Sequence, residues 1–93
     1  MLWIIYAESA LYCGYGQHFV VEALNKSSAE FLADADMQEY FYEQDYDQAV
    51  EEGQKAEAGT YSIMSCEPFG PDHESWEFYC DPGQSEFYTR VNV

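Results

Sequence analysis

The chain has 93 residues, with 18 Asp and Glu against 3 Lys and Arg, so its formal net charge is -15 at pH 7. That balance excludes a protein that binds nucleic acid or phosphorylated substrates through basic side chains. A composition with 47% hydrophobic and 18% aromatic residues also excludes a disordered acidic tail. We therefore expect a single folded domain over residues 1–93.

The first residues predict two paired strands. Residues 2–6 form a short apolar run of strand-forming side chains, and residues 18–23 form a second run. The stretch between them, residues 8–17, contains two glycines and indicates a loop. Because this connection is too short for a crossover helix, the two strands are expected to pair antiparallel.

A helical region follows the second strand. Ser27 and Glu30 have the spacing of a capping box, in which each side chain accepts a backbone N–H group at the helix start. Residues 29–58 contain no proline and one glycine, and helix-forming side chains dominate them. Gly59 is expected to end the region.

The apolar periodicity of this region is interrupted. It slips near residues 34–36 and resumes afterwards, which favours two helices or one broken helix, with the break near residues 43–45. Asp45 and Gln48 have the spacing to cap the second piece. Among the tyrosines, Tyr40 is expected to pack with Phe41, and Tyr46 with Val50, on the sheet; the alternative is that one or two project outward as contact residues.

The C-terminal third returns to a period of two. Residues 60–66, 75–80 and 86–91 predict three strands, separated by clusters of proline and glycine. The order is two strands, one or two helices and three strands. This order predicts an α+β fold with a single antiparallel sheet and the helices packed on one of its faces.

Cysteine and metal-ligand patterns are weak. Cys13, Cys66 and Cys80 are odd in number and lack C-x-x-C spacing, so we expect reduced thiols, a cytoplasmic protein and no zinc site. The two Asp-x-Asp pairs, at positions 34–36 and 45–47, lack the glycine and glutamate of an EF-hand. No nucleophile motif or phosphate-binding loop is present, so we expect neither an enzyme nor a cofactor.

The main candidate site is an acidic helical cluster, because more than half of the carboxylates lie between positions 30 and 57. Glu39, Glu43, Asp47 and Glu51 recur every four residues, which places them on one helix face about 6 Å apart. Like charges at this spacing destabilise a helix, and exposed helices usually interleave both signs. The alternative is a solvated face without a partner. The predicted partner-binding residues are Asp34, Asp36, Glu39, Tyr42, Glu43, Asp45, Asp47, Glu51 and Glu52.

Adaptation to high salt also produces acidic, lysine-poor chains, but it would distribute carboxylates evenly over the surface. The clustering instead favours a positively charged partner, and surfaces that hold nucleic acid are the most abundant positively charged surfaces in cells.

In size and charge the chain resembles small, very acidic bacteriophage-type proteins that mimic nucleic acid, a class that includes anti-restriction and anti-CRISPR proteins. The resemblance implies a non-enzymatic inhibitor that occupies the basic nucleic-acid-binding surface of a host defence nuclease or CRISPR effector complex. It implies a monomer or weak homodimer in the bacterial cytoplasm, without direct contact to nucleic acid or membrane. The alternative is an acidic antitoxin or immunity protein that neutralises a basic partner protein.

Overall fold

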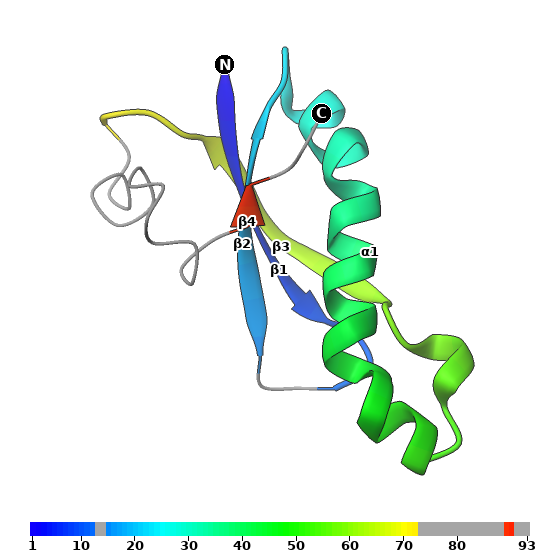
Figure 1. Ribbon diagram of the computed structural model, residues 1–93. Coiled ribbons are helices and arrows are strands. Elements are labelled where there is room, and N and C mark those ends of the chain that lie inside the picture. Colours follow the sequence, from blue (N-terminus) through cyan, green and yellow to red (C-terminus); the bar gives the residue numbers. More distant parts are fainter. Residues whose placement is uncertain (13–14, 73–88, 91–93) are drawn as a thin grey trace.

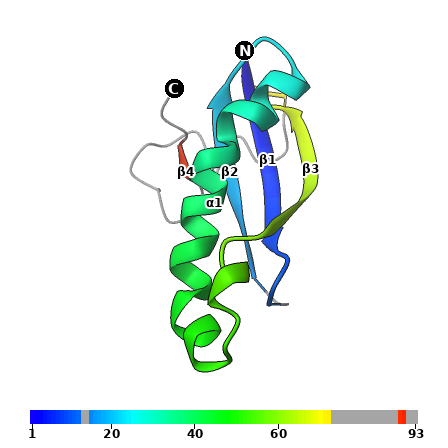
Figure 2. The same ribbon diagram turned by 90° about the vertical axis from the view of Figure 1, so that its right-hand side faces the viewer.

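The computed structural model describes residues 1–12, 15–72 and 89–90. Its elements are β1 (Leu2–Ser9), β2 (Gly16–Glu22), α1 (Lys26–Glu51), the short 3-10 helix η1 (Lys55–Glu57), β3 (Tyr61–Pro68) and β4 (Thr89–Arg90). The described strands form one sheet in the spatial order β3-β1-β2-β4, and α1 lies along one face of it (Figures 1 and 2). The predicted α+β class, with helix on one face, is confirmed.

The centre of the sheet is β1, which pairs antiparallel with β2 on one side and with β3 on the other. Both β1 and β2 are longer than the sequence indicated. Part of the loop predicted over residues 8–17 belongs to the sheet, because Glu8 pairs with Gly16 and Ser9 pairs with Tyr61. Gly16 is the first residue of β2, and a Cβ there would lie 2.6 Å from the Ala7 carbonyl oxygen, so the close approach of β1 favours glycine at this strand position.

The strand order departs from the prediction at one edge. Within the predicted strand 86–91, the described residues are Thr89 and Arg90, which form β4 and pair parallel with β2. The expectation of an entirely antiparallel sheet is therefore wrong at β4. Alternation along a strand reports which residues share a face and carries no information on strand direction. The strand predicted over residues 75–80 lies outside the described residues.

Both faces of the central strands are buried. On the face toward α1, Ile5 and Phe19 pack against the helix residues Met37 and Phe41. On the other face, Ile4, Val20 and Phe69 form a smaller cluster. This double burial explains why residues 2–6 are apolar without alternation.

The helix is one continuous element of 26 residues, so the predicted break near residues 43–45 is wrong. Its N-cap is Asn25, whose side-chain oxygen accepts a hydrogen bond from the Ser28 backbone N–H at 2.9 Å. The capping box predicted for Ser27 is therefore replaced by a cap two residues earlier; Asn is among the best N-cap residues because its short side chain reaches the first turn.

The helix ends before the predicted Gly59. It stops at Glu51, and Gly53 has a φ of 73°, the left-handed conformation that commonly terminates helices. Among the described residues no helix combines the length and the apolar character needed to cross a membrane.

Candidate functional site: the outer face of α1

The two faces of α1 are set by a four-residue repeat. The fully buried positions occur at every fourth residue and are Ala29, Ala33, Met37, Phe41, Asp45 and Ala49. Each residue turns an α-helix by about 100°, so a side chain two positions from a buried one points to nearly the opposite side. Glu39, Glu43, Asp47 and Glu51 each lie two positions from a buried residue, and the structure leaves all four exposed. We call these four residues the acidic row.

Three of the other predicted site residues are held by contacts within the protein. Asp34, half-buried, accepts hydrogen bonds from the Tyr61 hydroxyl of β3 and from the Gln38 amide. Burial, followed by the hydrogen bond and the charge of Asp34, raises the pKa of Tyr61 above its ordinary value. Asp36 is also half-buried. Asp34 therefore faces β3, and neither residue belongs to the acidic row.

Glu52, the C-cap residue, is exposed, but both of its carboxylate oxygens accept hydrogen bonds. It accepts a hydrogen bond from the Tyr12 hydroxyl at 2.9 Å and one from the Gln48 amide at 3.3 Å. Desolvation, the hydrogen bond to Glu52 and the negative charges of Glu52 and Asp45 raise the pKa of Tyr12 to about 12. This contact fastens the segment after β1 to the end of α1.

Asp45 does not belong to the surface. It is fully buried, so its carboxylate is not available to a partner, and it caps no second helix. Its two oxygens accept hydrogen bonds from the Ser9 hydroxyl at 3.2 and 3.3 Å, and one of them also accepts the Gly59 backbone N–H at 3.3 Å. Asp45 thus joins α1 to the end of β1 and to the turn before β3. Its place in the buried repeat explains why the apolar pattern appeared to break.

A second row of exposed side chains runs beside the acidic row. Tyr42, Tyr46 and Val50 also recur every four residues and are 41%, 37% and 48% exposed. We call them the apolar strip. The expectation that Tyr46 and Val50 pack on the sheet is therefore wrong, whereas Tyr40 and Phe41 do pack there, with ring centroids 5.7 and 6.2 Å from that of Phe19.

The two rows meet at the surface. The rings of Tyr42 and Tyr46 are 5.5 Å apart, and together with Glu43 and Asp47 they line a shallow depression. The Lys55 ammonium, carried by η1, lies 5.7 Å from the ring centroid of Tyr46. The exposure of Tyr42 and Tyr46 agrees with the alternative that one or two tyrosines project outward. Tyr46, Val50 and Lys55 are not among the predicted site residues; the four-residue spacing of the strip is the signal that could have identified the first two.

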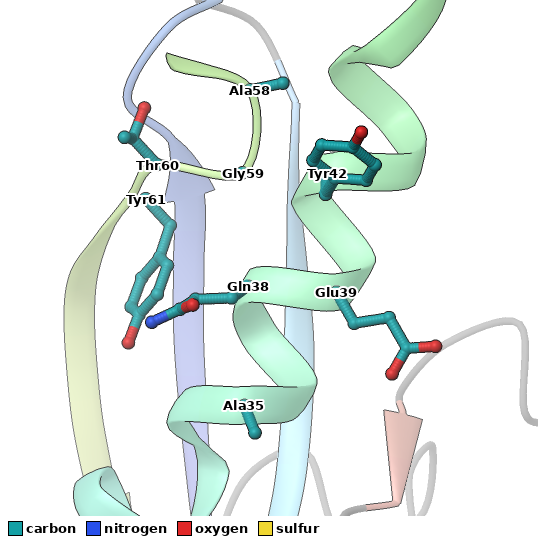
Figure 3. A pocket seen from close by; sticks show the side chains of 8 residues that line it. All are labelled: Ala35, Gln38, Glu39, Tyr42, Ala58, Gly59, Thr60 and Tyr61. Atoms are coloured by element: carbon teal, nitrogen blue, oxygen red, sulfur yellow. The ribbon is translucent and has the colours of Figure 1, made fainter. Parts of the chain in front are cut away.

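A groove of about 690 Å³ lies between α1 and the segment 58–61. Figure 3 shows Gln38 pointing toward Tyr61 in the groove, whereas Glu39 points away from that segment. Gly59 backs onto the helix with a φ of 94°. A Cβ there would lie 3.1 Å from the Gln38 carbonyl oxygen and 3.2 Å from the Tyr42 Cβ. The close approach of the turn to α1 therefore requires glycine at this position.

Metal and thiol chemistry find no support in the described part of the chain. No group of three or more His, Cys, Asp or Glu side chains there could hold a metal ion. Cys66 lies on β3 and packs partly against the core, and burial raises the pKa of its thiol, which disfavours the reactive thiolate. Cys13 and Cys80 lie outside the described residues.

Comparisons with protein-family models, with curated proteins and with solved structures give no match.

Proposed function

We propose that this protein is a non-enzymatic inhibitor whose acidic row occupies a basic nucleic-acid-binding surface of another protein. The observation that carries the proposal is the row itself: four exposed carboxylates on the outer face of one continuous helix. Successive members are about 6 Å apart along the helix axis, comparable with the spacing of phosphates along an extended nucleic-acid strand.

The charge of the helix strengthens this proposal. Lys26 is the single basic residue in α1, and it lies at the first helical position, about 20 Å along the axis from Glu39. The members of the row repel one another by a few tenths of a kcal/mol per pair. A cationic surface would relieve this repulsion, speed association and select partners by charge. The expected targets are the DNA- or RNA-binding channels of host defence nucleases, including CRISPR effector complexes.

The test compares two variants with the same change in net charge. Glu43→Lys with Asp47→Lys reverses the centre of the row, whereas Glu22→Lys with Asp72→Lys reverses exposed carboxylates elsewhere. Wild type and both variants are immobilised, bacterial proteins are captured at low salt, and each captured protein is assayed for nucleic-acid binding. We expect the row variant to lose capture, the control to keep most of it, and free wild type to displace nucleic acid from the captured protein.

Two results would contradict the proposal. Equal capture by the two variants would show that the row is only a solvated face. Capture that depends on the row but is insensitive to added nucleic acid would instead favour an acidic antitoxin or immunity protein. Binding through the row should also weaken steeply as salt rises, because cations screen the acidic row and anions screen the basic surface of the partner.

A further inference from the structure

The apolar strip beside the acidic row exposes two tyrosine rings, which mimicry of nucleic-acid charge alone does not require. Tyr42 and Tyr46 expose more than a third of their surface although the chain has a core in which tyrosines such as Tyr40 pack. Exposed tyrosines are typical contact residues at interfaces, where the ring contributes area at a small cost in side-chain entropy.

The chain itself shows what this surface accepts. Lys55 places its ammonium 5.7 Å from the Tyr46 ring centroid, within the range of a cation–π interaction. The carboxylates of Glu43 and Asp47 line the same depression as this ring. The depression therefore combines aromatic rings with negative charge, and one of these rings already has a cation over it.

From this arrangement we infer that the surface receives an arginine side chain of the partner, which stacks on Tyr46 in place of Lys55 and pairs with Glu43 and Asp47. The inference rests on the proposed function and specifies the partner's chemistry at one site. Arginine is favoured over lysine because its planar guanidinium stacks on an aromatic ring while its N–H groups still reach carboxylates. An ammonium is more strongly hydrated and gains less from the ring.

The test uses two synthetic peptides as probes, one of alternating glycine and arginine and one of alternating glycine and lysine, with equal length and charge. Affinities are measured by calorimetry at about 20 mM NaCl, where screening is weak. We expect the arginine peptide to bind more tightly to wild type. Replacing both rings, by Tyr42→Leu with Tyr46→Leu, should weaken the arginine peptide about two- to five-fold and remove its advantage over the lysine peptide.

Two controls belong to this experiment. Phe31→Leu removes an 80% exposed ring elsewhere on α1 and should leave the preference for arginine intact. Lys55→Gln and Lys26→Gln remove the same charge at opposite ends of the helical region. If the partner's arginine takes the place of Lys55, Lys55→Gln should strengthen binding of the arginine peptide more than Lys26→Gln does.

Three results would overturn the inference. Wild type could bind the two peptides with equal affinity, or the preference for the arginine peptide could survive the loss of both rings. Lys55→Gln and Lys26→Gln could also change the affinity for the arginine peptide equally. A second readout needs no substitution: the NMR signals of the Tyr42 and Tyr46 rings should shift more with the arginine peptide than with the lysine peptide. Failure here leaves the acidic row intact as a proposal, because the row is tested by charge reversal and nucleic-acid competition.

Discussion

Asp45 and Asp47 are two residues apart in the same helix, yet they have opposite environments. Asp45 is fully buried and accepts hydrogen bonds from Ser9 and Gly59, whereas Asp47 is exposed in the acidic row. The 200° rotation between them accounts for the difference. The residue type therefore does not indicate whether an aspartate is buried or exposed. Its position relative to the buried four-residue repeat decides this.

The first prediction compares alanine at these two positions. Asp45→Ala should lower the free energy of unfolding by about 1–3 kcal/mol or more, because the Gly59 N–H and the Ser9 hydroxyl lose a buried acceptor. Relief of like-charge repulsion offsets only a few tenths of a kcal/mol. Asp47→Ala should be neutral or slightly stabilising, since the side chain is exposed and alanine favours helix. Urea unfolding measures both, and equal effects would contradict the buried role of Asp45.

Asp45→Asn separates the acceptor from the charge. The asparagine carbonyl can still accept the Gly59 N–H, and its amide group can donate to the Ser9 oxygen. We therefore expect this variant to recover most of the stability lost with alanine. A loss as large as that of Asp45→Ala would mean that the charge itself is required.

At the scale of the elements, α1 packs on the sheet mainly through one narrow stripe, which is formed by its fully buried positions. Small residues, Ala29 and Ala33, let the first half of the helix approach the strands closely, while Met37 and Phe41 fill the space further along. Phe41 contacts four aromatic residues. Its ring centroid lies 6.2 Å from those of Tyr15 and Phe19, 5.1 Å from that of Tyr40 and 6.1 Å from that of Tyr61. The presentation of the acidic row depends on this stripe, because it fixes the rotation of the helix about its axis.

The second prediction tests the stripe with two phenylalanines of the same helix. Phe41→Ala should cost about 3–5 kcal/mol, because it removes a fully buried ring and leaves a cavity. Phe31→Ala should change stability by no more than about 0.5 kcal/mol, since Phe31 is 80% exposed. Thermal unfolding followed by circular dichroism distinguishes them. A large loss for Phe31→Ala would show that the helix face is assigned incorrectly.

For the whole molecule, the dominant electrostatic effect is repulsion among its negatively charged side chains. A net charge of -15 on 93 residues opposes the compact state, and the hydrophobic clusters on both faces of the sheet have to offset it. Binding to a cationic surface would remove part of this repulsion. Association and stability should therefore respond to salt in opposite directions.

The third prediction follows from that repulsion. The melting temperature should rise when NaCl is increased from low ionic strength to about 0.5 M, where the Debye length falls to about 4–5 Å. A variant with neutral amides at all four positions of the acidic row provides the control, because it carries less charge to screen. Its gain should be smaller than that of wild type. An unchanged or lower melting temperature for wild type would contradict a surface dominated by like charge.

The sequence alone determined the α+β class, the presence of a long helical region, the first two strands and the four-residue spacing of the acidic row. These features depend on local periodicity and on composition, which each segment carries by itself. The environments of Asp34, Asp45 and Glu52, the parallel pairing of β4 and the exposure of Tyr46 and Val50 were decided by tertiary structure. They depend on which side of α1 faces the sheet and on where the fold places side chains that are distant in sequence, such as Ser9, Tyr12 and Tyr61. A buried aspartate in a helix stripe has the same local pattern as a break, and only its partners from other elements reveal that the helix continues.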